Sequence, residues 1–244
     1  MAGVRLHLLE GFALESVDSF VDVPVGMQRL LALLALRGSA HRCVVAGTLW
    51  PEVPEAQALA SLRTGIWRMN RAVPGVVRAD GSHLAMATTI DVDSREQEAF
   101  ATGLLRDHLE DERWISAGLH TLWHGELLPG WYDDWVVFER ERLNQLRLHA
   151  MERTAALLTR RRELDTALQL ALEAVRAEPL RETATAVLMS VYLAEGNVSD
   201  AIHQLDVFQD LLERELGLEP SPMLRRLLPG SRHRFDAPVT TQPA

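Results

Sequence analysis

An internal repeat in the C-terminal half constrains the fold of this chain more than any other feature. Residues 162–175, RELDTALQLALEAV, align with residues 196–209, GNVSDAIHQLDVFQ, at an offset of 34 residues. Three apolar pairs match at this offset: Ala167 with Ala201, Leu168 with Ile202, and Leu158 with Tyr192. A repeat of this length is one supersecondary unit, which buries its apolar face only by stacking on a neighbour. The sequence therefore predicts stacked helix pairs in this region.

Thirty-four residues is the period of the tetratricopeptide repeat (TPR), whose unit is two antiparallel helices. Asp165 and Ser199 stand at equivalent positions, where we expect the N-terminal caps of the second helices. Before the repeat, residues 120–158 begin as an apolar and aromatic segment and continue as a long amphipathic helix. Such an array presents a concave surface to protein partners. A plain helical bundle is the alternative interpretation.

The N-terminal part has a different pattern. Residues 4–23 form short alternating runs broken by turn residues, which predict two or three antiparallel strands. Residues 25–38 carry an apolar stripe at helical spacing, and residues 44–51 predict a short helix that ends at a proline. A third helix follows, with Pro54 in its first turn and Pro74-Gly75 at its end.

A hairpin is predicted after the third helix, because Asp80-Gly81 separates two short β-prone runs. Strands, three helices and a hairpin follow one another in a winged helix. There the third helix enters the DNA major groove and the hairpin touches the backbone nearby. The expected fold class is therefore mixed, with an α+β winged helix-turn-helix followed by an all-α TPR-like domain.

The third helix has two distinct faces. Apolar residues recur at spacings of 3, 4, 3 and 4, and they are Leu59, Leu62, Ile66, Met69 and Val73. The opposite side carries Gln57, Ala60, Thr64, Trp67, Arg68 and Arg71, with Arg63 on the flank. An arginine can neutralise a phosphate or read guanine O6 and N7 through its planar fork. The alternative is a merely solvated face, with Trp67 in the core.

Charge is unevenly distributed along the chain, whose formal net charge is -9. Residues 1–93 hold eight arginines and nine acidic residues, whereas the remaining 151 residues hold 17 arginines and 25 acidic residues. Four arginines and no acidic residue occur from Arg63 to Arg78, and His83 follows on the hairpin. The acidic total argues against non-specific coating of nucleic acid but allows a local basic face.

Several functional classes are not expected. The chain has no glycine-rich phosphate loop and no G-x-S-x-G motif, and the acidic pair Asp133-Asp134 suits a helix start, so no enzyme and no cofactor are expected. His120 and His124 have a spacing that could ligate a metal, but no third ligand is marked and no metal site is expected.

A cytoplasmic location is also expected from the sequence. No window approaches ~18 consecutive apolar residues, so no membrane span is predicted. The first residues lack the long apolar run of an export signal, and the single cysteine, Cys43, cannot form an internal disulfide.

Six segments occur in a specific order and spacing. They are LWP (49–51), SLRTGIWRMNRAV (61–73), IDVD (90–93), LWHGELLPGW (122–131), DWVVFERERL (134–143) and LGLEPSPMLRRL (216–227). Through them, roughly residues 4–228 resemble the antibiotic-regulatory (SARP) family of actinobacterial transcriptional activators. The resemblance implies an OmpR-type winged helix over residues 1–93 and a bacterial transcriptional activator domain over residues 94–230. Residues 231–244 are polar and lack periodicity, which predicts a disordered tail.

The resemblance also implies a function. Members bind direct repeats in double-stranded promoter DNA as side-by-side protomers, here a homodimer on DNA. They recruit RNA polymerase through its sigma and alpha subunits, and a specialised gene cluster, such as one for a secondary metabolite, is the expected target. The implied DNA-binding residues are Thr64, Trp67, Arg68 and Arg71 in the groove, Arg63 beside them, and Arg78, Ser82 and His83 on the wing.

Two departures from the family pattern keep a second hypothesis open. Met69-Asn70-Arg71 stands where the family helix often has an L-R-R pattern, and Ser82-His83 follows Gly81 where an aromatic residue is usual. The alternative is a TPR-type protein-interaction regulator whose winged helix binds DNA weakly or not at all.

Overall fold

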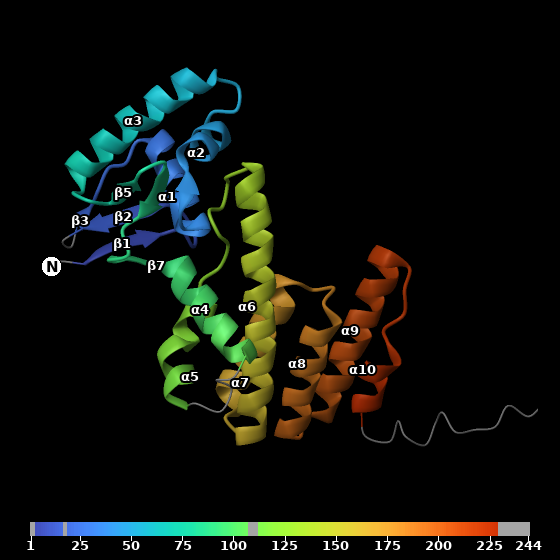
Figure 1. Ribbon diagram of the computed structural model, residues 1–244. Helices are drawn as coiled ribbons and strands as arrows, with labels where there is room; N and C mark the ends of the chain where they lie inside the picture. The colour runs from blue at the N-terminus through green and yellow to red at the C-terminus, as the bar shows by residue number, and fades with distance from the viewer. Residues whose placement is uncertain (1–2, 17–18, 107–111, 229–244) are drawn as a thin grey trace, which may run out of the picture. The chain divides into compact units, whose positions relative to one another are not determined.

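The structure divides the chain into two compact units. The computed structural model describes residues 3–16, 19–106 and 112–228. The N-terminal unit comprises residues 1–102 and 113–146, and the C-terminal unit comprises residues 103–112 and 147–244. Figure 1 shows the small strands only at the N-terminal end of the chain and helices alone from α6 onward. The fold is therefore mixed, with a small-sheet region followed by a predominantly helical region.

The N-terminal unit follows the predicted order of strands, three helices and a hairpin. Its strands are β1 (Val4–His7), β2 (Ala13–Ser16), β3 (Ser19–Phe20), β4 (Ala40–His41), β5 (Val77–Asp80), β6 (His83–Met86) and β7 (Ile90–Val92). Its helices are α1 (Val25–Arg37), α2 (Arg42–Leu49), α3 (Glu55–Ala72), the first part of α4 (Asp93–Arg106), α5 (Glu112–Gly118), the 3-10 helix η1 (Leu119–Trp123) and the first half of α6 (Asp134–Arg161).

The strands form two sheets. The first has the order β3-β2-β1-β7, with β1 antiparallel to β2 and parallel to β7. The second has the order β4-β6-β5, in which the predicted hairpin β5–β6 gains β4 as a neighbour. The antiparallel strands predicted over residues 4–23 are confirmed. Strands β4 and β7 were not expected, because two or three residues are too few to show an alternating pattern.

Helix α1 lies at the centre of this unit. Leu30, Leu31, Leu33 and Leu34 point in different directions around the helix, yet each is 0 or 1% exposed. A helix that is apolar on all sides is stable only when it is surrounded. Helix α3 packs on this core through the predicted stripe, whose five members are all buried or half-buried. Pro54 caps α3 from just outside its first turn, not from inside it as predicted.

Residues from the middle of the chain complete the N-terminal core. Leu127, Leu128, Trp135, Val136 and Leu143 are all at most 7% exposed and belong to the same apolar cluster as α1. Backbone bonds join the two regions: Leu128 N–H donates to Leu8 C=O at 2.8 Å, and Glu10 N–H donates to Glu126 C=O at 2.8 Å. Contacts therefore do not divide the chain at residue 93, and the domain boundary placed there stays a prediction.

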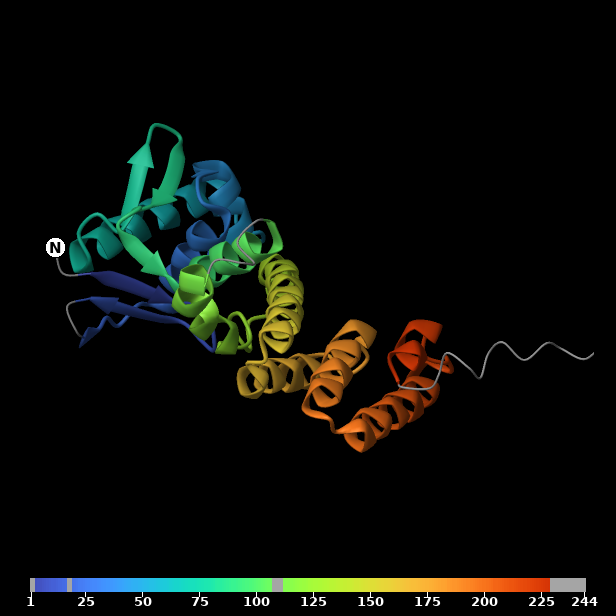
Figure 2. The same cartoon turned by 90° about the horizontal axis from the view of Figure 1, so that it is seen from below.

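The described part of the C-terminal unit consists of helices, in which three successive helices pack side by side and the last helix packs on the one two before it (Figure 2). After the second half of α6 come α7 (Leu164–Ala177), α8 (Glu182–Glu195), α9 (Val198–Leu216) and α10 (Pro222–Leu227). Its core includes Met189, Ala201, Phe208 and Leu224, each 0 or 1% exposed. No described helix is long and apolar enough to cross a membrane.

The turns of the C-terminal unit repeat with the 34-residue period. Arg162 and Gly196 both adopt positive φ, 66° and 88°. In each turn the next residue donates its N–H to a carbonyl five residues earlier, Glu163 to Leu158 at 3.0 Å and Asn197 to Tyr192 at 2.8 Å. The matched Ala167 and Ala201 are both 0% exposed. The offset read from the sequence is therefore a structural repeat.

One local prediction needs correction, one falls outside the described residues, and the two histidines with metal-like spacing can now be placed. Asp165 and Ser199 are not caps: α7 begins at Leu164 and α9 at Val198, so both side chains lie within the first turn. Residues 119–123 form a 3-10 helix and His124 follows it, so the two histidines do not share an α-helical face. The tail over residues 231–244 lies outside the described residues.

Candidate nucleic-acid interface

Helix α3 presents a continuous face of polar and aromatic side chains. Thr64, Trp67, Arg68 and Arg71 are all exposed, and so is the flanking Arg63. Trp67 is 61% exposed, which excludes the alternative that it belongs to the core. The exposed indole offers an apolar surface beside the arginines, which a partner could contact. The helical geometry thus brings these five predicted residues together.

Trp67 and Arg71 contact each other on this face. The guanidinium carbon of Arg71 lies 5.5 Å from the centre of the Trp67 ring. The two residues are four apart on one helix, so their side chains are neighbours, and a cation over an indole face is attracted by the ring. Arg71 is therefore held close to the helix surface with its hydrogen-bond donors free to point outward.

The other side chains of the face differ in whether they form hydrogen bonds within the protein. The Thr64 hydroxyl donates to the Ala60 carbonyl at 3.0 Å, so it offers only an acceptor to a ligand. Arg63 and Arg68 make no ion pair or hydrogen bond with any other described residue. Elsewhere in the unit, Arg5 and Arg142 are paired with carboxylates. The arginines of α3 therefore keep their donors available.

Asn70 fixes the hairpin to the end of α3. Its side-chain amide donates to the Val77 carbonyl at 2.9 Å, and its side-chain oxygen accepts from the Val77 N–H at 3.0 Å. Val77 is the first residue of β5, so one side chain sets where the hairpin begins relative to the helix. The sequence marked Asn70 only as a departure from the family pattern. No pattern in the sequence pointed to these two bonds.

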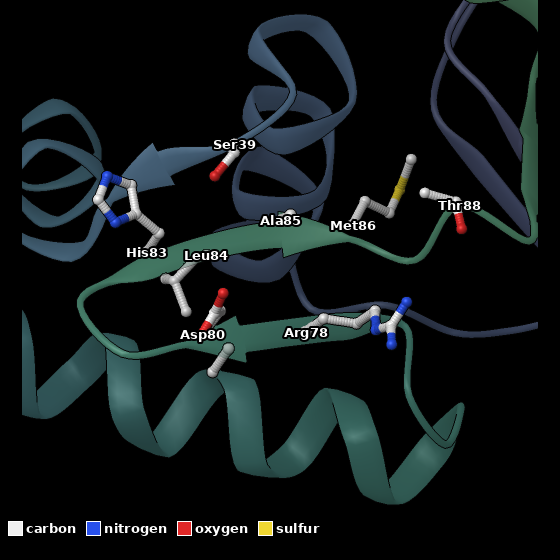
Figure 3. Close-up of a pocket in the computed structure, with 9 residues that line it drawn as sticks. Ser39, Arg78, Asp80, His83, Leu84, Ala85, Met86 and Thr88 are labelled. Carbon is white, nitrogen blue, oxygen red and sulfur yellow. The ribbon is translucent and has the colours of Figure 1, made fainter.

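The hairpin carries the three remaining candidates. Strand pairing places Arg78 opposite Ala85 and Asp80 opposite His83, which puts these side chains on one face of the sheet. Figure 3 shows Arg78 near one end of the hairpin and His83 near its turn, with α3 running alongside. They border an open hollow of about 560 Å³. The structure thus separates Arg78 from Ser82 and His83, and Asp80 keeps the face from being uniformly basic.

The tip of the hairpin is tied to the start of α2. Ser82 C=O accepts from the Arg42 N–H at 2.8 Å, and the His83 ring packs edge-on against His41 at 5.4 Å between centres. The Ser82 hydroxyl lies 3.3 Å from His83 Nδ1. Ser82 and His83 are therefore held in place near the first turn of a second helix.

The titratable side chains outside this face bear on whether the unit could hold a metal ion. Among the described residues, no three His, Cys, Asp or Glu side chains are close enough to hold a metal ion. The exposed Cys43 thiol hydrogen-bonds with Glu55, which raises its pKa and favours the protonated form. Asp133 directly precedes α6, accepts backbone bonds from its first turn and pairs with Arg29, in agreement with the helix-start interpretation.

Comparison with known proteins adds a family and two relatives. Residues 93–229 match the family described as bacterial transcriptional activator domain. The chain is 31% identical over 220 residues to the regulatory protein AfsR of Streptomyces coelicolor and 31% over 222 residues to that of Streptomyces griseus. Each match covers 81% of this chain, which spans only about a fifth (21%) of the relative.

A solved structure has a similar fold. It is Mycobacterium tuberculosis EmbR in complex with a low affinity phosphopeptide, with a TM-score of 0.72 and 19% identity. The similarity covers 93% of this chain and 64% of that one. At this identity the likeness shows the fold alone.

Proposed function

The chain belongs to the antibiotic-regulatory (SARP) family of transcriptional activators with a bacterial transcriptional activator domain, and we propose that it binds promoter DNA through α3 and the β5–β6 hairpin. One observation carries the proposal. In a chain of net charge -9, α3 exposes Arg63, Arg68 and Arg71 beside an exposed Trp67, and none of the three arginines is ion-paired with a described residue.

The arrangement of elements supports a winged helix. The third helix exposes its basic face, and the hairpin that follows is attached to its end through Asn70. In a winged helix the third helix enters the major groove, which is wide enough for one α-helix, while the hairpin reaches the neighbouring backbone. We assign α3 to the groove and β5–β6 to the wing.

Within this assignment the side chains have different roles. Arg68 and Arg71 are placed for base edges or phosphates inside the groove, and Arg63 for a phosphate at its margin. Trp67 supplies apolar contact and keeps Arg71 near the helix. Because the Thr64 hydroxyl donates within the helix, Thr64 contributes an acceptor or its methyl group. On the wing, Arg78, Ser82 and His83 are placed for the backbone.

The C-terminal unit is proposed as a TPR-like module for protein partners. Its 34-residue structural repeat supports this class, and its acidity disfavours contact with DNA. By family resemblance, the partners are the sigma and alpha subunits of RNA polymerase, and protomers bind side by side on direct repeats. Because a bacterial promoter lies in the nucleoid, we propose that the protein acts in the cytoplasm, in association with the nucleoid.

Binding to DNA is tested with the promoter regions of neighbouring genes. Retention of a labelled fragment is measured at several salt concentrations, and the protected bases are mapped by footprinting. We expect one fragment to be retained specifically, with the logarithm of the binding constant falling linearly against the logarithm of salt concentration. Protection of two repeated sites on one face would support side-by-side protomers.

The residue assignment is tested with Arg68→Ala and Arg71→Ala. Each should weaken specific retention about tenfold or more, because a groove contact by arginine contributes ~1–3 kcal/mol. Arg214→Ala removes an exposed arginine of α9 and is the matched control. Unchanged binding by both α3 variants would show that the interface lies elsewhere.

A second candidate function has one observation in its favour. Asn70 occupies a position where the family often has arginine, and both the nitrogen and the oxygen of its side-chain amide bond to Val77. A phosphate contact is thereby lost, which favours a protein-interaction regulator with weak DNA binding. This second function would be supported if the chain retained none of the promoter fragments specifically but did capture RNA polymerase subunits.

A further inference from the structure

A second cavity lies in the N-terminal unit, away from α3 and the hairpin. It is about 370 Å³ in volume and is bordered by β1, α4, α5 and η1. Its lining combines an aromatic wall with an arginine and a glutamate. Small-molecule sites in proteins are usually concave, mostly apolar and provided with a few placed polar groups, at volumes of ~300–1,000 Å³. The cavity has the size and composition of such a site.

The aromatic wall is built by close packing of α4 and α5. The rings of Phe100 and Trp114 lie 6.2 Å apart between centres with an angle of 32° between their planes. A methyl group on Gly118 would lie 2.0 Å from the Phe100 ring, so only glycine allows this approach. Because Phe100 is 3% exposed, its ring is fixed by its surroundings. Phe100 therefore supports Trp114, whose half-buried ring is the preformed surface for a planar apolar group.

The polar end of the cavity is an ion pair on its rim. Arg5 Nη2 donates to Glu96 Oε2 at 2.8 Å, and both side chains remain partly open, at 42% and 39% exposed. A guanidinium has five donors, and in the described residues this is the one bond that Arg5 makes through its side chain. Glu96 likewise keeps acceptor capacity. The rim therefore offers a donor and an acceptor side by side.

We propose that this cavity binds a small planar aromatic molecule that carries an amide or lactam group. The ring lies against Trp114, which Phe100 supports from behind. The carbonyl oxygen accepts from Arg5, and the adjacent N–H donates to Glu96. A carboxylate would face Glu96, and an ammonium would face Arg5, so either charged group disturbs the ion pair. A neutral donor–acceptor edge satisfies both partners without separating them. This inference does not depend on DNA binding.

Three compounds with one ring and different head groups test the chemistry. Indole-3-acetamide, indole-3-acetate and tryptamine are titrated onto the full chain by ligand-observed NMR. We expect saturable binding of the amide with a Kd on the order of 1 mM, as is usual for so small a ligand, and binding of the other two at least about fivefold weaker. Absence of saturable amide binding overturns the proposal, and so does equal binding of all three compounds.

Two variants locate the site. Ala117→Leu fills part of the cavity and should reduce amide affinity at least about fivefold, whereas Ser116→Leu, on the same helix but outside the lining, should not. Glu96→Gln removes the negative charge from the rim, so indole-3-acetate should gain affinity relative to tryptamine. Unchanged binding in Ala117→Leu, with thermal unfolding like that of the parent chain, places the ligand elsewhere and overturns the assignment. An unchanged acetate-to-tryptamine ratio in Glu96→Gln overturns the role of the rim.

Discussion

At the scale of single residues, Asn70 shows how a position can appear functional in sequence and prove structural. Its neighbours Arg68 and Arg71 are exposed, but Asn70 is half-buried and turned toward β5. Both of its hydrogen bonds go to Val77, which is 3% exposed. A buried backbone amide left without a partner costs free energy, so this side chain stabilises the junction between helix and hairpin.

Asn70→Ala should therefore lower stability and loosen the hairpin. We expect a loss of ~1–3 kcal/mol in the free energy of unfolding, because Val77 N–H and C=O lose their partners. Urea denaturation followed by circular dichroism measures the change. Gln57→Ala removes an exposed amide from the same helix and should change stability by less than about 0.5 kcal/mol. Equal stability of the two variants would show that water replaces the Asn70 bonds.

At the scale of elements, the two equivalent turns show which feature of the 34-residue repeat is the same in both repeat units. Gly196 ends α8 at φ 88° and ψ 4°, a left-handed conformation that glycine adopts without strain. Arg162 adopts the same region in the equivalent turn, at φ 66°. The turn hydrogen bonds are equivalent as well. Backbone conformation, not residue identity, is thus what repeats here.

Replacing glycine by alanine should have opposite effects at two positions. Gly196→Ala should destabilise the chain by ~1 kcal/mol or more, because a β-carbon is strained in this conformation. Gly47→Ala should stabilise by roughly 0.5–1 kcal/mol, because Gly47 is exposed inside α2 with open space around it. Thermal unfolding of the full chain compares them, and a loss of stability in both would refute the conformational explanation.

A charged cluster links α6 to α7 and should make stability depend on pH. Glu173 accepts bonds from Arg176 at 2.7 and 2.9 Å and from Arg147 at 2.9 Å, which lower its pKa from the ordinary 4.5. A lowered pKa means that the unfolded chain takes up the proton first as pH falls. The stabilisation is therefore present above about pH 4.5 and is lost as pH falls through the lowered value.

Glu173→Gln provides the comparison. The variant should lose less stability than the parent chain between about pH 5 and about pH 3, because glutamine does not titrate. Urea midpoints at four pH values across this range measure the difference. Equal losses of stability in the variant and the parent chain would show that the Glu173 cluster does not contribute to the pH dependence of stability.

Helices and strands could be predicted from the sequence more accurately than the tertiary contacts between them. The stripe of α3, its exposed arginines and the hairpin followed from spacing and from Asp80-Gly81, since these signals are local. The cap positions were wrong by two residues, because Asp165 and Ser199 are good capping residues while Glu163 and Asn197 occupy the cap positions through backbone geometry. The Asn70–Val77 bonds and the Phe100–Trp114 wall depend on tertiary contacts, which the periodicity of the sequence does not predict.

At the scale of the whole molecule, the N-terminal unit depends on residues far along the chain. The carboxylate of Asp93 accepts the N–H groups of Leu8 and Leu9 at 2.9–3.0 Å, which fixes the start of α4 to the end of β1. The Arg140 guanidinium donates to the carbonyls of Leu127 and Trp131 at 2.7 and 2.9 Å, which fixes the loop before α6 to that helix. The same loop bonds residues 8–10. The apolar surface of the first 93 residues is therefore completed by the segment that follows.

Two fragments test where the N-terminal domain ends. A fragment of residues 1–93 lacks five large buried side chains, Leu127, Leu128, Trp135, Val136 and Leu143. At ~1.5–3 kcal/mol for each buried side chain, this loss is on the order of 10 kcal/mol, comparable with the whole stability of a domain. We expect this fragment to show no cooperative thermal transition. A fragment of residues 1–146 should unfold cooperatively, and under the proposed function it should retain the same promoter fragment as the full chain.

A third fragment separates the two sets of contacts. The fragment of residues 1–128 keeps the backbone bonds to residues 8–10 but loses the start of α6. Its thermal transition should therefore have a lower midpoint and be less cooperative than that of residues 1–146. If residues 1–93 unfold with the same midpoint as residues 1–146, the boundary predicted at residue 93 is right and the later segment only covers a finished core. If only the longest fragment is cooperative, the folding unit that contains α3 includes the first turns of α6. A change in α6 would then reach the proposed DNA interface through Trp135, Val136 and Leu143, which share its core.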